Sequence, residues 1–133
     1  MRDGGTRGDF LIREAGSVPA QEVARSSGAT IQVLLGAEQG MPNLFLRVFT
    51  LERGGRIPLH SHDNIEHQQL MLAGRMRLVL DGREHLVRSG DAIYIPPRCA
   101  HSYENAGEGE ARFLCAVPAG VEYSTEWLDE ASG

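Results

Sequence analysis

Residues 54–74 read GGRIPLHSHDNIEHQQLMLAG, and this stretch decides how the rest of the chain is interpreted. It holds His60, His62 and His67, three of the five histidines in the sequence, and His101 follows a Pro-Pro pair further along. Residues i and i+2 of a β-strand share a face, so His60 and His62 point the same way. Neutral imidazole suits iron, copper, nickel and zinc, and also manganese where geometry rather than affinity selects the ion. The four histidines therefore predict a site for a divalent transition metal.

The segments around this stretch alternate apolar and polar residues with the period of a β-strand. Arg75–Asp81 is the clearest, and Asp81-Gly82 at its end is a strong hairpin signal. Further strands are expected at 31–35, 43–52, 84–88, 91–95, 101–105 and 112–117, separated by turns that include Gly54, Gly74, Gly82 and Gly90. Residues 16–28 are interpreted as a loop, and no segment keeps a helical period over three turns. This pattern predicts an all-β protein built as an antiparallel sandwich or barrel.

The two histidine-containing stretches resemble the two motifs of the cupin superfamily. The first motif runs glycine, five residues, His-x-His, three or four residues, glutamate, six residues, glycine, and it is matched by Gly54, His60 and His62. The second runs glycine, five residues, proline, x, glycine, two residues, histidine, three residues, asparagine, and it is matched by Gly90, Pro96, His101 and Asn105. Arg98 stands where the second motif has its second glycine. The resemblance implies a single-domain cupin-type β-barrel, an antiparallel double-stranded β-helix or jelly roll.

We expect this barrel to occupy residues 10–118. Residues 1–9, which are rich in glycine and charge, are expected to form a flexible lead. Residues 119–133 form a C-terminal tail with two open interpretations, an edge strand around Tyr123–Leu128 or a disordered segment.

Two neighbouring residues compete for the position of the glutamate in the first motif. Glu66 lies three residues after His62 but seven before Gly74, whereas His67 satisfies both spacings. Adjacent strand residues face opposite ways, so only one of the two can face the metal. We favour His67, which gives the ligand set His60, His62, His67 and His101 and resembles the small all-histidine cupins.

One feature of the sequence opposes this choice. Leu70 and Leu72 share parity with Glu66, so hydropathy alone would turn Glu66 and the two leucines inward. A contact that covers the outer face of this strand would remove the conflict.

The same parity argument predicts residues beside the metal. Gln69 and Met71 accompany His67, and Tyr103 accompanies His101. Gln69 and Tyr103 are candidates for catalytic side chains that hydrogen-bond a substrate. Met71, together with Phe49 and Cys115, is expected to line the pocket, although each of these also fits ordinary core packing, with Cys115 as an inert thiol.

The composition excludes several classes of function. A net charge of -5 without a basic run argues against binding nucleic acid. All 13 cationic side chains are arginine, which excludes Schiff-base chemistry and a Walker-type phosphate loop. No apolar stretch approaches the roughly 20 residues of a membrane helix, and the N-terminal sequence does not read as a secretion signal. We therefore expect a cytoplasmic protein with no membrane partner.

Because a small barrel has strand edges to protect, we also expect a homodimer in which residues 10–13 pair with the sheet of the second copy.

The predicted site suggests a class of chemistry. Four neutral ligands leave the charge of a divalent ion uncompensated, which favours a small-molecule substrate that is anionic or enolisable. The leading interpretation is a metal-dependent enzyme of the oxygen-using dioxygenase type. The alternatives are a non-catalytic module that binds metal or a small molecule, and a cupin isomerase, epimerase or lyase, because this fold and metal do not fix a reaction.

Overall fold

The structure is a computed structural model that describes residues 9–128. Apart from Asp9, the predicted flexible lead at 1–9 lies outside the described residues, as do residues 129–133 of the tail. The elements are η1 (Ala15–Ser17), β1 (Gln21–Glu22), β2 (Ser27–Leu35), η2 (Ala37–Gln39), β3 (Leu44–His62), β4 (His67–Ala73), β5 (Arg75–Leu80), β6 (Arg83–Arg88), β7 (Ala92–Ile95), β8 (His101–Asn105), β9 (Ala111–Pro118) and β10 (Thr125–Trp127). Within 9–128, no helix is both long and apolar enough to cross a membrane.

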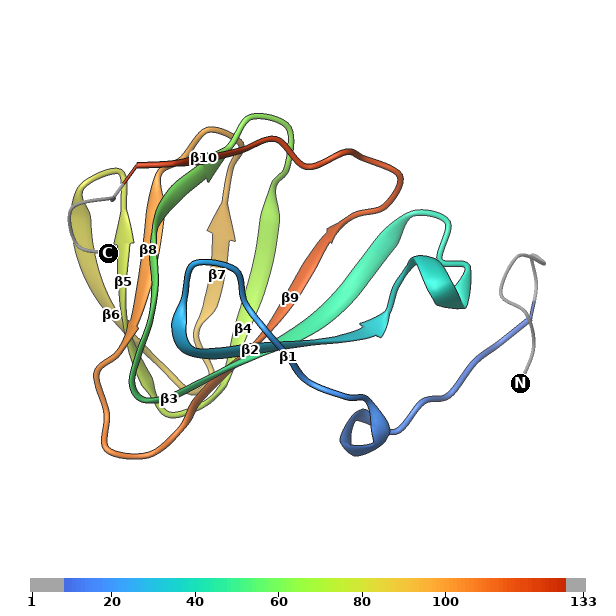
Figure 1. Ribbon diagram of the computed structural model, residues 1–133, viewed down its shortest axis with the longest axis horizontal. Helices are drawn as coiled ribbons and strands as arrows, with labels where there is room; N and C mark the ends of the chain where they lie inside the picture. Colours follow the sequence, from blue (N-terminus) through green and yellow to red (C-terminus); the bar gives the residue numbers. More distant parts are fainter. Residues whose placement is uncertain (1–8, 129–133) are drawn as a thin grey trace.

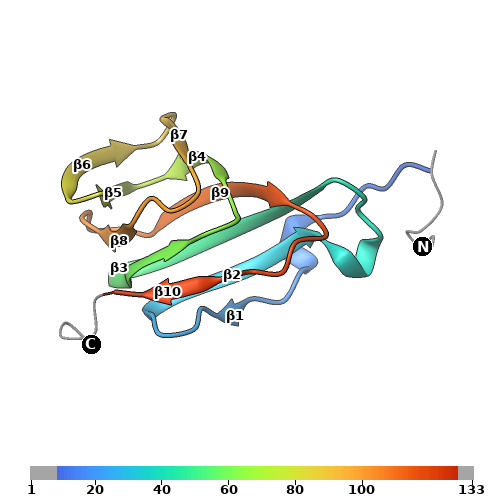
Figure 2. The same cartoon turned by 90° about the horizontal axis from the view of Figure 1, so that it is seen from above.

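The strands form one curled antiparallel sheet in the order β6-β5-β8-β3-β9-β4-β7. β2 and β10 also pair with β3, and β1 pairs with β2. Figures 1 and 2 show the result, with β1, β2 and β10 on one side of the molecule and β4 to β7 on the other. The predicted all-β antiparallel barrel is confirmed. The region 16–28, interpreted as loop, contains the short β1 and the start of β2 in addition to turns.

β3 is longer than the sequence suggested, because the predicted turn at Gly54 is a bend within one continuous strand. The part before the bend pairs with β9 and with most of β2, and the part after it pairs with β8, with β10 and, through Arg56, with Ser27 at the start of β2. Gly54 has φ +76°, a left-handed conformation that favours glycine. At Gly55 a Cβ atom would collide with the carbonyl oxygen of Gly28. The Gly54-Gly55 pair therefore lets one strand belong to both halves of the barrel.

The alternation on β4 resolves the conflict between parity and hydropathy. His67, Gln69 and Met71 are buried, whereas Leu70 and Leu72 are each 40% exposed. Gln68 and Leu70 pair with β7 and β9 on either side, so the strand is central and its orientation is fixed by both neighbours. His67, Gln69 and Met71 face the interior, and Leu70 and Leu72 face outward.

Arg98 explains why the second motif usually carries glycine at its position. Its φ of 69° lies in the left-handed region, which costs a residue with a side chain about 1–2 kcal/mol relative to glycine. Its backbone N–H donates to the carbonyl of His62 at 2.6 Å, so this turn is joined to the end of β3.

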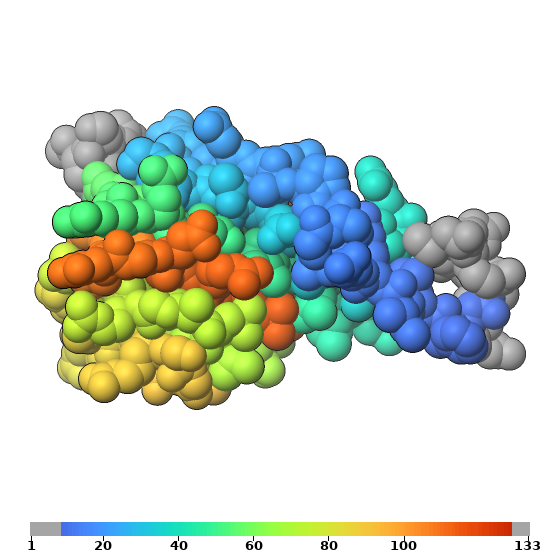
Figure 3. Space-filling view, turned by 90° about the horizontal axis from the view of Figure 1, so that it is seen from below, coloured from blue at the N-terminus to red at the C-terminus, as the bar shows by residue number. Residues whose placement is uncertain are grey.

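The second-motif asparagine closes the end of the barrel opposite the histidines. Asn105 is 5% exposed, and its Nδ2 donates to the carbonyl oxygens of Leu51, Glu52 and Gly109 at 3.0, 3.0 and 2.8 Å. Its Oδ1 accepts from the Gly107 N–H at 2.9 Å. Figure 3 shows this end, where the orange turn between β8 and β9 packs between the green bend of β3 and the yellow-green turn after β4. One side chain therefore ties the bend of β3 to the turn before β9.

Replacement of Asn105 by alanine is expected to lower the free energy of unfolding by roughly 2–3 kcal/mol, because each buried group left without a partner costs about 1–3 kcal/mol. Urea denaturation measures the change. Asn64→Ala is the matched control, since Asn64 also bridges two segments, through Glu122 and Ser124, but at an exposed position. We expect the control to cost less than about 1 kcal/mol. Equal losses in the two variants would contradict this role for Asn105.

Candidate metal centre

Four imidazole rings meet at one end of the barrel, close to β10. His60 and His62 lie at the end of β3, His67 is the first residue of β4, and His101 is the first residue of β8. The ring centroids of His60 and His101 are 4.3 Å apart, and those of His60 and His62 are 5.1 Å apart. The His67 ring lies 5.2 Å from His62 and 5.3 Å from His101. In His60, His62 and His101 the nitrogens that could bind one ion lie within 4.8 Å of one another, whereas His67 does not belong to this group of three, so the structure supports three of the four predicted ligands.

His62 and His67 lie on strands that do not pair with each other. β9 lies between β3 and β4 in the sheet, and residues 63–66 connect the two strands. His67 therefore approaches His62 across the barrel and not along a hairpin ladder.

In three of the rings, Nδ1 has a hydrogen-bond partner, and Nε2 is the nitrogen that remains available for a metal. Nδ1 of His60 lies 2.8 Å from the Pro58 carbonyl oxygen, and Nδ1 of His101 lies 2.9 Å from that of Cys99. A carbonyl can only accept, so in both rings Nδ1 carries the proton and Nε2 has a lone pair. Nδ1 of His62 lies 2.9 Å from Thr125 Oγ1. Metal-binding histidines are oriented by bonds of this kind.

Two buried ring nitrogens have no hydrogen-bond partner among the described residues. They are Nε2 of His101 and Nδ1 of His67. A buried polar atom without a partner is costly, and a bound cation would satisfy such lone pairs. The donor set of neutral imidazoles and these unpaired nitrogens fit a divalent transition metal.

The environment keeps these imidazoles neutral. Burial lowers the pKa of His60, and burial with the nearby His60 and Arg47 lowers the pKa of His62 to about 4. Burial and the charge of His60 lower the pKa of His101 to about 3. Burial, together with His101 and His62, lowers the pKa of His67 even further. At neutral pH the cluster can donate lone pairs without first releasing protons, which favours metal binding.

Glu66 faces away from the cluster. It is exposed, and a hydrogen bond to it raises the pKa of the Tyr94 hydroxyl on the outer face of β7. The alternation at the start of β4 thus directs His67 inward and leaves Glu66 outside.

A cavity of about 290 Å³ leads to the four rings. Of the residues predicted beside the metal, Phe49, Gln69, Tyr103 and Cys115 line this cavity. Met71 lies instead in the hydrophobic core, 1% exposed, and is not among the lining residues. Gln69 Nε2 donates to the Tyr103 hydroxyl at 2.8 Å, and the Tyr103 ring stacks on Phe113 with centroids 5.0 Å apart.

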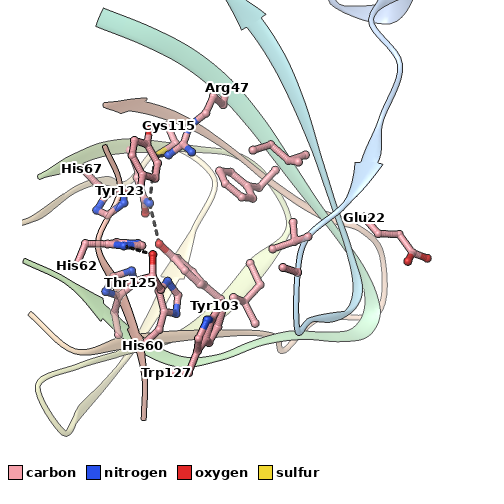
Figure 4. Close-up of a pocket in the computed structure, with 17 residues that line it drawn as sticks. Glu22, Arg47, His60, His62, His67, Tyr103, Cys115, Tyr123, Thr125 and Trp127 are labelled. Atoms are coloured by element: carbon pink, nitrogen blue, oxygen red, sulfur yellow. Dashed lines mark hydrogen bonds between the residues drawn. The ribbon is translucent and has the colours of Figure 1, made fainter. Parts of the chain in front are cut away.

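Sequence analysis missed one wall of the cavity, which is built by the end of the described chain. Tyr123, Thr125 and Trp127 all line it, and Figure 4 shows them beside the histidines. β10 pairs with β3 so that Thr125 lies opposite His62 and Trp127 opposite His60. The signal was the spacing of 123, 125 and 127, which puts these residues on one face of the edge strand left open for the tail.

Arg47 was missed as well. It precedes Phe49 by two residues on β3, so the parity that predicted Phe49 also applied to Arg47. Both residues line the cavity. A charged residue was passed over because charged side chains are almost never fully buried without a partner.

Comparison with known families identifies the fold. A family model described as a cupin domain matches residues 47–117, just over half of the chain. The chain is a cupin. The matched region runs from the strand that carries Arg47 and Phe49 to the end of β9, and it includes all four histidines.

This cupin is similar in structure to the polyketide cyclase RemF from Streptomyces resistomycificus, with a TM-score of 0.82 and 28% sequence identity over 92% of this chain and 89% of the other. It is also 30% identical to the polyketide synthase CurC of Streptomyces cyaneus. That match extends over 98 residues and covers 70% of this chain and 61% of CurC. It is 41% identical over 51 residues to quercetin 2,3-dioxygenase of Bacillus subtilis, which covers 38% of this chain and 15% of that enzyme. The chain spans two thirds or less of the length of the curated relatives it matches.

The stability of the metal-free protein is expected to fall as the pH is lowered from about 6.5 towards 3. The pKa values of the folded-state cluster lie below the ordinary 6.5, so the unfolded chain binds more protons in this window and acid favours unfolding. Above 6.5 the rings are neutral in both states, and their contribution is fully present. Urea denaturation of chelator-treated protein at a series of pH values measures the slope.

His67→Gln should reduce this slope, because it removes one ring of the cluster. His85→Gln is the control, since His85 lies exposed on β6 away from the cavity, and it should leave the slope unchanged. A His67→Gln variant with the slope of the parent protein would contradict the expectation.

Proposed function

We propose that this cupin is a metal-dependent enzyme that binds a divalent transition metal through His60, His62, His67 and His101 and cyclises a small, enolisable polyketone. One observation carries the proposal. Four neutral imidazoles converge at a cavity of about 290 Å³, and two of their buried nitrogens have no hydrogen-bond partner among the described residues. When bound, a divalent ion in such a site supplies Lewis acidity that polarises a carbonyl oxygen and favours an enolate.

The substrate class is supported by two similarities that cover most of the chain. The match to RemF, a polyketide cyclase, extends over 92% of this cupin, and the match to the polyketide synthase CurC over 70%. In an aldol-type cyclisation, a methylene carbon between two carbonyls loses a proton and forms a bond to a carbonyl carbon of the same chain. The C=O π bond at that carbon breaks, and its oxygen takes up a proton to become a hydroxyl, so no atom is gained or lost. Such a substrate is enolisable, which agrees with the class expected from the neutral ligand set.

Tyr103 is suited to hydrogen-bond an oxygen of this substrate. Burial raises the pKa of its hydroxyl above the ordinary value, so at neutral pH it remains protonated and acts as a donor rather than a base. Gln69 donates to the phenol oxygen, and the stack on Phe113 fixes the ring. A fixed donor is most effective on an oxygen that gains negative charge during the reaction.

Aromatic side chains form the walls around the reacting position. Phe49, Tyr123 and Trp127 line the cavity, and Trp127 lies 4.8 Å from His60, centroid to centroid. Apolar walls limit the access of water, and exclusion of water strengthens the polar contacts inside the cavity. β10 supplies Trp127 and the segment just before it supplies Tyr123, so the end of the described chain acts as a wall of the site as well as an edge strand.

Dioxygenase activity is a second candidate. The observation that favours it is the 41% identity to quercetin 2,3-dioxygenase, over a segment of 51 residues. The proposed histidines would hold an ion of a kind that could supply either chemistry. The two functions differ in whether dioxygen is consumed.

Substitutions at two adjacent residues, His67 and Glu66, test whether His67 is the fourth metal ligand. We expect His67→Gln to weaken metal affinity by more than the roughly 10–100-fold that loss of an outer-sphere partner causes. Glu66→Gln should keep near-stoichiometric metal, because Glu66 faces outward. Mass spectrometry of untagged protein reconstituted with iron, manganese, copper, nickel or zinc measures the content. Loss of metal in Glu66→Gln but not in His67→Gln would overturn the assignment.

The reaction class is tested with the metal-loaded protein, a linear aryl triketone and quercetin. We expect a cyclised product from the triketone at equal rates under nitrogen and in air, without uptake of oxygen. Tyr103→Phe should retain metal but lower the rate by about 100-fold, the typical loss when one such donor is removed. Stoichiometric oxygen uptake with quercetin would favour the dioxygenase instead. A metal-loaded protein that turns over neither compound would support the non-catalytic binding module.

A further inference from the structure

We infer that Arg47 is a specificity-determining residue of this cavity and that it binds a carboxylate on the substrate, beyond the carbonyls that react. The inference rests on the proposed function for the reacting part of the molecule. It extends that function by assigning the substrate a negatively charged group and by naming the side chain that recognises it.

The contacts of Arg47 leave its charge without a counter-ion in the described part of the chain. Its Nη2 donates to Cys115 Sγ at 3.2 Å. Its guanidinium carbon lies 5.2 Å from the Phe49 ring centroid and 6.0 Å from that of Tyr123. Its Nε is buried and has no hydrogen-bond partner among residues 9–128. A thiol and two aromatic rings do not neutralise a guanidinium, and a buried charge is costly until it is paired.

Arg47 is also the cation that the cavity presents to a ligand. Glu22 is the carboxylate among the described lining residues, but it is exposed. Figure 4 shows the Glu22 side chain directed away from the histidines, whereas Arg47 lies near His67, Tyr123 and Cys115. A guanidinium presents several N–H donors in a planar fork that matches a carboxylate. Since Nε has no partner among residues 9–128, a carboxylate that contacts the guanidinium would satisfy this donor and neutralise the charge.

The position of Arg47 leaves space for a longer substrate. A second cavity, of about 460 Å³, adjoins the first and shares Ile31, Arg47 and Tyr123 with it. Its other walls come from the segment around Val18 and from η2. Arg13 also lines it, but the Arg13 guanidinium donates to the carbonyls of Val33 and Leu34. Arg47 thus stands at the junction of the two cavities with donors available to a ligand.

The test compares three β-diketones. Succinylacetone has a carboxylate tail, its methyl ester has the same tail without the charge, and acetylacetone has no tail. Dissociation constants are measured by calorimetry on metal-loaded protein. We expect the parent protein to prefer the acid to the ester by about tenfold, which corresponds to about 1.4 kcal/mol. Arg47→Met, which keeps an apolar stem beside Phe49, should reduce this ratio to near one and leave the affinity for acetylacetone within about twofold. Arg47→Lys should retain part of the preference.

Arg112→Met is the control, because it removes an arginine from a neighbouring strand at a position that does not line either cavity. It should keep the ratio of the parent protein. An unchanged ratio in Arg47→Met would overturn the inference even if acetylacetone and metal bind normally. Failure of metal and acetylacetone to bind would instead overturn the proposed function. In that case the same acid and ester, titrated into chelator-treated protein and its Arg47→Met variant, still report whether Arg47 distinguishes them.

Discussion

The bend of β3 is the constraint on which the rest of the structure depends. One strand belongs to both halves of the barrel because Gly54 adopts a left-handed conformation and Gly55 passes close to the backbone of Gly28. Before the bend, β3 contributes Arg47 and Phe49 to the cavity; after it, the strand ends in His60 and His62. Asn105 fixes the bend by donating to the carbonyls of Leu51 and Glu52. The two motifs therefore cooperate across the barrel: the second motif anchors the strand that carries the histidine pair of the first.

Much of this architecture could be predicted from the sequence because strand parity is a strict local rule. Arg75–Leu80 forms β5 in a hairpin with β6, and His101–Asn105 forms β8, as their alternation indicated. Parity also outweighed hydropathy on β4, where Gln69 lies inside and Leu70 outside. What parity cannot give is the pairing of strands distant in sequence. The connection of β3 to β4 through residues 63–66 and the seating of β10 on β3 depend on such pairings. Arg47 was not predicted for another reason: charged side chains are usually placed outside, whereas this one lines the cavity.

Burial of the histidines has two opposing effects that a bound cation would reconcile. Desolvation keeps the rings neutral, and the carbonyls of Pro58 and Cys99 fix the tautomers of His60 and His101. The same burial leaves the lone pair of His101 Nε2 without a protein partner among the described residues. A metal-free cluster is thus less stable in acid and incompletely satisfied at neutral pH. The buried, unpaired imidazoles lower the stability of the metal-free protein, and a bound cation would offset this loss. Such destabilising groups are typical of functional sites.

The residues of the two motifs and the residues that select a substrate are separate sets. The motif positions supply the bend, the anchor and the imidazoles, and these explain why proteins described as a cyclase, a synthase and a dioxygenase can all resemble this chain. Arg47, Tyr123 and Trp127 lie outside the motifs, yet they form the cavity walls next to the rings. Because the fold and the metal do not determine the reaction, the choice of substrate must come from such wall residues. If the proposed function and the proposed role of Arg47 hold, a cationic junction beside apolar walls would favour a molecule with an apolar, enolisable body and a charged end over a neutral flavonol or a sugar.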